Sequence, residues 1–188
     1  MRLMPGAMQC PSPNTGNRYV VPRCIIIHYT AGRDYESSLR WLTDPASRVS
    51  AHFLVGRKGQ LAQLVPVGLD AWHAGSSKWR EYDRLNRYSV GIELDNHGLL
   101  KGEPGNYRTW YGDKVPDRDT ITLTHPQTGV PSGWHRYTDQ QLRKLDEVIL
   151  WVRSQYDKRA LSVIGHYQVA PTRKIDPGPA FPGFSYVT

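Results

Sequence analysis

The sequence predicts a single α/β domain in which helices flank a mixed central β-sheet. Its 188 residues suit one domain, 39% of them are hydrophobic, and short apolar strands alternate with amphipathic segments. The chain has two cysteines. These are too few for a disulfide scaffold or a four-cysteine zinc site, so we expect free thiols. We expect an irregular leader over residues 1–19 and the folded domain over residues 20–188.

Short-range patterns predict the first elements of this domain. The β-branched run at 23–28 is typical of a strand buried on both faces. Residues 34–42 have apolar side chains at helical spacing and begin with an aspartate that suits an N-cap. Four turn residues, 56–59, separate apolar runs at 51–55 and 60–65 and predict a β-hairpin.

The second half of the chain is less regular. Residues 90–95 alternate between apolar and polar and predict a strand. Residues 98–134 are rich in Gly, Pro and Tyr without a clear period, so we expect a long loop insertion. Residues 138–156 begin with a capping box and continue with apolar side chains spaced three and four apart, as in a core-facing helix. Residues 161–164 predict a short buried strand, and a proline-rich coil follows from 171.

Charge and hydropathy exclude some functions. Lys and Arg total 24 against 17 Asp and Glu, a net charge of +7, but the basic residues are scattered and no arginine-rich helix is present. We therefore expect no nucleic-acid partner. No run of about 18 apolar residues exists, which predicts no membrane span. The N-terminus lacks the apolar stretch of a signal peptide, so we expect no signal peptide. We also expect the protein to be a monomer.

Two histidines are candidates for metal ligation. His28 and His166 each follow a buried strand, and ligands in open α/β sheets bind just past such strand ends. Asp176 follows in a segment stiffened by prolines. Two imidazoles and one carboxylate can form a zinc site with an open position. The alternative is that both histidines bond to backbone and the aspartate belongs to a turn, since neither HExxH nor CxxC occurs.

Other residues have two possible roles. Glu93 in a strand either faces solvent or, if it faces a metal, moves protons. Lys174 lies two residues before Asp176 and either stabilises an oxyanion or lies on the surface. Trp72 and His73 either line a groove or belong to the core and a turn.

Five short stretches occur in a consistent order between residues 20 and 182. They are 26–30 (IIHYT), 50–55 (SAHFLV), 72–75 (WHAG), 86–94 (NRYSVGIEL) and 165–179, which contains GH, AP and KIDPGP. Together they resemble the zinc-dependent N-acetylmuramoyl-L-alanine amidases of type 2, the AmpD-like enzymes related to phage amidases and peptidoglycan recognition proteins.

The resemblance implies a mixed sheet with helices on both sides and one zinc ion bound by His28, His166 and Asp176. It implies that Glu93 is the catalytic carboxylate and that Lys174 is the oxyanion partner. The implied reaction is hydrolysis of the amide between N-acetylmuramic acid and L-alanine in peptidoglycan. The implied substrate-binding residues are Trp72, His73, His52, Asn86 and Arg173. The alternative is a non-catalytic peptidoglycan-binding module of the same fold.

The sequence departs from its relatives at several positions. Asp176 stands where the short phage and recognition proteins often have Cys, and Ala51 stands where they have Tyr. Both differences favour the AmpD-like branch. The pair 167–168 is Tyr-Gln rather than Ser-Asp, so another group must orient a ligand histidine. With no signal peptide expected, a phage endolysin released to the cell wall and a cytoplasmic recycling amidase both remain open.

Overall fold

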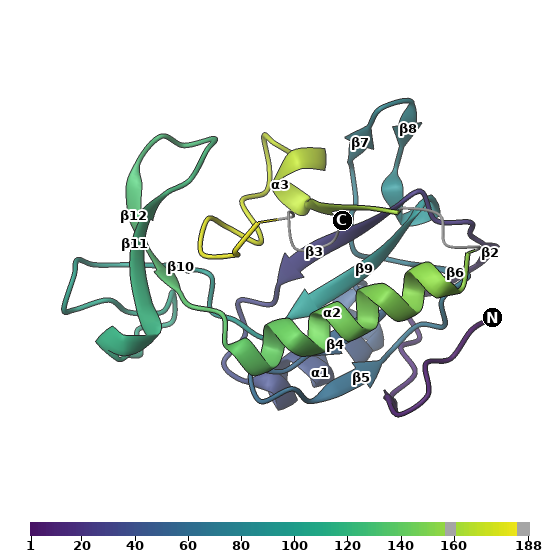
Figure 1. The fold of residues 1–188 in the computed structure, drawn as a ribbon, viewed down its shortest axis with the longest axis horizontal. Coiled ribbons are helices and arrows are strands. Elements are labelled where there is room, and N and C mark those ends of the chain that lie inside the picture. Colours follow the sequence, from purple (N-terminus) through teal and green to yellow (C-terminus); the bar gives the residue numbers. More distant parts are fainter. Residues whose placement is uncertain (157–160, 184–188) are drawn as a thin grey trace.

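The computed structural model describes residues 1–156 and 161–183, and its centre is a six-stranded mixed sheet (Figure 1). The strand order is β1-β5-β4-β9-β3-β13. These strands are β1 (Met8–Gln9), β3 (Cys24–Tyr29), β4 (Phe53–Val55), β5 (Leu61–Gln63), β9 (Ser89–Leu94) and β13 (Ser162–Gly165). Strands β4, β9, β3 and β13 run parallel to one another, and β4 and β5 form the predicted antiparallel hairpin. The predicted fold class is confirmed.

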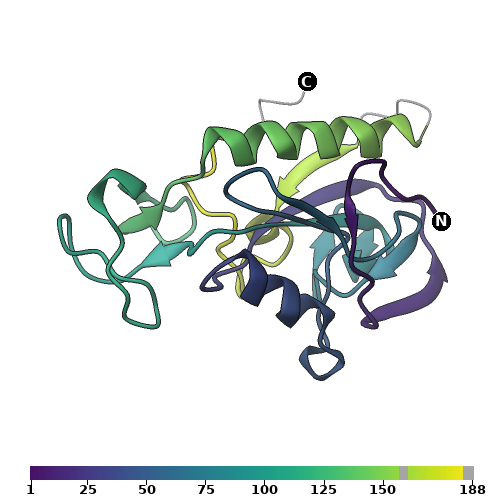
Figure 2. The ribbon, with the colours of Figure 1, turned by 90° about the horizontal axis from the view of Figure 1, so that it is seen from below.

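Helices cover both faces of this sheet (Figure 2). The helices are α1 (Tyr35–Thr43), α2 (Asp139–Ser154) and α3 (His166–Val169), with the short 3₁₀ helices η1 (Pro45–Ser47), η2 (Leu85–Arg87) and η3 (Asp117–Asp119). On one face, Leu145 of α2 packs in the same core as Ile27 of β3. On the other face, Leu42 of α1 packs with Leu54 of β4. Successive strand residues point to opposite faces, so β4 contributes Phe53 and Val55 to the first core and Leu54 to the second.

The helix starts follow the predicted caps. The Asp34 side chain accepts a hydrogen bond from the backbone of the third helical residue of α1, and Thr138 does the same for α2. However, the Gln141 side chain does not close a capping box. It is fully buried and donates 3.0 Å hydrogen bonds to the carbonyl oxygens of Val55 and Asp95. It therefore ties α2 to the central sheet.

The insertion at residues 98–134 is not a loop. It contains an antiparallel sheet of order β10-β12-β11, which projects from the side of the domain (Figures 1 and 2). The strands are β10 (Leu99–Leu100), β11 (Thr120–Thr124) and β12 (Pro131–His135). Its own small core consists of Leu100, Tyr107 and Val115. The composition concealed this sheet because its strands are short and its turns supply many glycines and prolines.

The expected irregular leader is also wrong in part. Strand β1 extends the central sheet by pairing with β5, and β2 (Thr15–Tyr19) pairs with β6 (Leu69–Ala71). A further hairpin joins β7 (Lys78–Trp79) and β8 (Tyr82–Asp83). Within residues 1–156 and 161–183, both cysteines are free, and no helix has the length and hydropathy needed to cross a membrane.

Candidate metal centre

Three segments bring His28, His166 and Asp176 together at one end of the sheet. His28 lies near the end of β3, His166 begins α3 directly after β13, and Asp176 lies in the following turn. Nδ1 of His28 lies 3.0 Å from Nδ1 of His166, and Oδ2 of Asp176 lies 2.9 Å from the first nitrogen and 3.0 Å from the second. All three residues are buried, and in the part of the chain that the structure describes they form the single group suited to a metal.

The donor set fits a divalent metal. In a tetrahedral site with zinc bonds of about 2.0–2.1 Å, two ligand atoms lie about 3.3 Å apart, close to the separations seen here. Burial would raise the pKa of Asp176, but the two neighbouring imidazoles lower it below its usual range, so the carboxyl is ionised. Burial and the nearby His166 lower the pKa of His28 to about 4, so its ring is neutral. A neutral imidazole and a carboxylate are the forms that bind zinc.

The outer nitrogens of both histidines also have partners. Nε2 of His28 lies 3.0 Å from Nδ1 of His73, and Nε2 of His166 lies 3.2 Å from the carbonyl oxygen of Ala74. The Asn86 side chain holds this turn, because its Oδ1 accepts hydrogen bonds from the backbone N–H groups of both His73 and Ala74, at 3.1 and 2.7 Å. The turn therefore orients both histidines. Positions 167–168 carry no carboxylate that could do so.

Glu93 faces the metal ligands rather than solvent. It is the register partner of His28 on the neighbouring strand β9, so both side chains leave the sheet on one face. Its Oε2 is buried and has no hydrogen-bond partner. Burial and the charge of Asp176 raise the pKa of Glu93 to about 8, against the opposing effect of Lys174. The carboxyl can thus exchange a proton near neutral pH.

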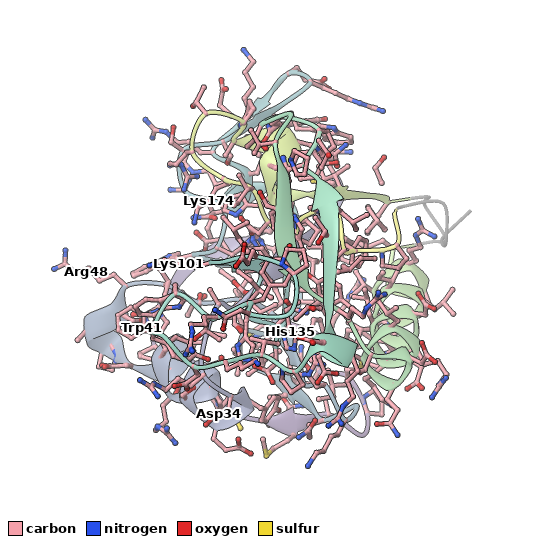
Figure 3. The ribbon with its side chains drawn as sticks, turned by 90° about the vertical axis from the view of Figure 1, so that its left-hand side faces the viewer. Asp34, Trp41, Arg48, Lys101, His135 and Lys174 are labelled. Carbon is pink, nitrogen blue, oxygen red and sulfur yellow. The ribbon has the colours of Figure 1, made fainter. Side chains whose placement is uncertain are left out.

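A groove of about 690 Å³ opens over these residues. Its lining includes Glu93, Lys174, and the indoles of Trp41, Trp72 and Trp110. Figure 3 shows Lys174 and Trp41 on one side of the molecule. The sequence analysis assigned no role to Trp41, an exposed aromatic on a helix. Trp110 reaches the groove from the insertion and donates a 2.8 Å hydrogen bond to the carbonyl of Ala31.

Comparison with known proteins identifies the family. Residues 17–179 match the model of the N-acetylmuramoyl-L-alanine amidase family. The chain belongs to this family. It is 34% identical to the N-acetylmuramoyl-L-alanine amidase AmiD of Escherichia coli, over 85% of this chain and 50% of that protein. It is 30% identical to the 1,6-anhydro-N-acetylmuramyl-L-alanine amidase AmpD of Escherichia coli, over 94% and 87%. The chain thus spans about half the length of the first relative.

Solved structures agree with the family. The chain superposes on a crystal structure of AmpD with a TM-score of 0.68 and 28% identity, covering 95% of this chain and 91% of that one. It superposes on AmiD from E. coli, in complex with the substrate anhydro-N-acetylmuramic acid-L-Ala-D-gamma-Glu-L-Lys, with a TM-score of 0.64 and 31% identity, covering 96% and 58%. The AmpD-like resemblance is confirmed.

Not every expected substrate-binding residue lies in the groove. Trp72, His73 and Arg173 line it. His52 is fully buried, accepts from the backbone N–H of Gly91 at 3.0 Å and contacts the carbonyl of Leu69 at 2.9 Å. It therefore supports the sheet.

Asn86 is the second correction. Its side-chain oxygen accepts hydrogen bonds from the turn that follows Trp72, and the residue does not line the groove.

Arg173 lines the groove and also holds the same turn. Its guanidinium donates to the carbonyl oxygens of Ala74 at 2.7 Å and Ser76 at 2.9 Å.

Proposed function

We propose that this protein hydrolyses the amide bond between N-acetylmuramic acid and L-alanine of the stem peptide. The observation that carries the proposal is that the metal-binding group shares one groove with Glu93, whose buried Oε2 has no hydrogen-bond partner. Support also comes from the relatives, which are named as amidases of this bond, and from the AmiD complex with an anhydro-muramoyl peptide.

His28, His166 and Asp176 would hold one zinc ion, since their donor set and spacing suit it. Zinc in such a site supplies a Lewis acid that polarises a carbonyl and makes water more acidic. In the bound substrate, the scissile amide would lie over this group, and the muramoyl and peptide parts would occupy the groove.

Glu93 is the proposed proton carrier. As an ionised carboxylate it takes a proton from the attacking water, and as an acid it delivers that proton to the departing nitrogen of L-alanine. A pKa of about 8 keeps both forms accessible near neutral pH. Lys174 lines the same groove and is close enough to lower the pKa of Glu93. Its ammonium would stabilise the negative charge that develops on the carbonyl oxygen.

One assay tests this function against the alternative of a non-catalytic binding module. Purified sacculi and a soluble anhydro-muramoyl tripeptide are incubated with zinc-loaded protein and with chelated protein. We expect release of stem peptide carrying a new L-alanine amine, and we expect the chelator to abolish it. Binding without release by the zinc-loaded protein would support the binding module instead.

The same two substrates separate the possible biological settings. A recycling amidase would prefer the soluble anhydro-muramoyl peptide, in line with the substrate named for AmpD. An endolysin would act on intact sacculi. The net charge of +7 would favour attraction to an anionic wall. Wall binding that did not weaken with added salt would contradict that contribution.

A further inference from the structure

A chain of hydrogen bonds runs from the backbone of η2 to the metal-binding group. It begins at Ser89, whose Oγ lies 2.5 Å from the carbonyl oxygen of Leu85. A carbonyl can only accept, so the serine hydroxyl uses its single proton there. The same Oγ lies 3.2 Å from Nε2 of His73. It can only accept in that contact, so Nε2 of His73 carries a proton.

The next contact transmits this constraint. The His73 ring contacts Ser89 through Nε2 and His28 through Nδ1. A neutral imidazole protonated on Nε2 has an acceptor at Nδ1. This Nδ1 lies 3.0 Å from Nε2 of His28, which therefore donates. A histidine binds a metal as a neutral imidazole, so a proton on Nε2 leaves the lone pair of His28 on Nδ1, the atom that faces His166 and Asp176.

We propose that Ser89 and His73 are positioning residues that hold His28 in the Nε2–H tautomer and direct its Nδ1 lone pair to the metal. The inference rests on the proposed metal site but not on turnover. Metal-ligating histidines usually obtain this orientation from a carboxylate or a backbone carbonyl. His166 does so through the carbonyl of Ala74. His28 instead depends on two side chains, which mutation can remove.

The shape of β9 supports the assignment. Residues 89, 91 and 93 share one face of this strand. Ser89 bonds to the His73 ring, Glu93 faces the groove, and Gly91 between them leaves room for the ring. A Cβ at Gly91 would lie 2.4 Å from Cγ of His73. The imidazole is thus held against the strand at a position where only glycine fits, which agrees with a fixed structural task.

The test compares Ser89→Ala with Ser12→Ala in the chain of residues 1–188. Ser12 is a matched control, because it is buried and donates a 2.6 Å hydrogen bond to the carbonyl of Leu42, outside the chain of contacts. Zinc affinity is measured by competition with a chromogenic chelator. We expect Ser89→Ala to weaken zinc binding by about 10–100-fold, and we expect Ser12→Ala to leave it unchanged. Ser89→Thr, which keeps a hydroxyl, should restore most of the affinity.

Histidine ¹⁵N spectra of the zinc-loaded chain give a second readout. We expect His28 and His73 to carry their protons on Nε2, and we expect Ser89→Ala to produce a mixture of tautomers at His73. His73→Phe keeps a ring over Gly91 without its nitrogens and should also weaken zinc binding. The His73→Phe variant keeps the proposal falsifiable if Ser89→Ala does not fold. Unchanged affinity in both variants, or His73 protonated on Nδ1, would overturn the proposal. Neither readout needs hydrolysis, so failure of the proposed amidase activity would be seen separately.

Discussion

His28 and Glu93 are register partners on the adjacent parallel strands β3 and β9. This single pairing sets the proposed metal ligand beside the proposed proton carrier, because paired residues of neighbouring strands project from the same face of a sheet. The two side chains therefore have separable tasks. His28 belongs to the metal-binding group, whereas the Glu93 carboxyl has no hydrogen-bond partner for Oε2.

Replacing Glu93 by Gln should separate metal binding from proton transfer. Glu93→Gln keeps the size of the side chain but cannot carry a proton, so we expect kcat to fall by about 10²–10⁴-fold while bound zinc is retained. Initial rates on an anhydro-muramoyl peptide and metal analysis check this. Glu103→Gln, at an exposed position of the insertion, is the control. A near-native rate in Glu93→Gln would remove this residue from the mechanism.

Lys174→Met tests stabilisation of the oxyanion. We expect kcat to fall by about 10²–10³-fold with a smaller change in KM, because the developing charge exists only in the transition state. Lys174 also lowers the pKa of Glu93. Its removal should move the rising limb of the rate–pH profile to higher pH. Lys58→Met, on the exposed hairpin turn, should change neither quantity. An equal loss in both lysine variants would contradict the assignment.

Acid should destabilise the metal-free protein through its buried histidines. Burial lowers the pKa of His52 to about 4, and burial with the charge of Arg57 lowers that of His135 to about 2, against about 6.5 in the unfolded chain. Between these values the unfolded state binds more protons. The free energy of unfolding should therefore fall as the pH drops from about 6.5, by up to about 1.4 kcal/mol per pH unit for each histidine.

Denaturant unfolding at several pH values between about 7 and 5 measures this slope. His52→Gln removes one titrating group and should flatten the slope, whatever its effect on absolute stability. Equal slopes in the parent chain and in His52→Gln would contradict a neutral His52 ring in the folded state.

Gln141→Met should weaken the attachment of α2 to the sheet. The variant keeps an unbranched side chain but removes both hydrogen bonds to the carbonyls of Val55 and Asp95. The carbonyl of Val55 keeps the backbone N–H of Asp95 as a donor, which limits the cost of the substitution. We expect a loss of about 1–3 kcal/mol in the free energy of unfolding. Gln140→Met changes the exposed neighbour and should be nearly neutral. Equal effects of the two substitutions would contradict a special role for Gln141.

Trp110 should contribute to substrate binding from the insertion. Its side chain lines the groove yet is 61% exposed, so a substrate can cover it. We expect Trp110→Ala to raise KM by about 2–10-fold with little change in kcat. Trp110→Phe, which keeps a ring but loses the bond to the carbonyl of Ala31, should have a smaller effect. Val130→Ala, at another exposed apolar position of the insertion, should leave KM unchanged.

Local patterns were sufficient to predict β3, β9 and both long helices. The apolar run before His28, the alternation through Glu93 and the caps at Asp34 and Thr138 each depend on residues close together in sequence. The strand-end rule also selected His28 and His166 as residues that meet. Local patterns did not predict the sheet in the insertion. It is held by pairing between short strands that lie far apart in the sequence, such as β10 and β12.

The sequence by itself determined the α/β class, the family and the residue types available for metal chemistry. The tertiary structure alone decided that Glu93 faces a groove instead of solvent, and that His52 and Asn86 support the scaffold instead of lining that groove. It also decided that His73 lies between Ser89 and His28. The physical reason is that periodicity specifies which residues share a face, whereas long-range packing determines what covers that face and which atoms meet there.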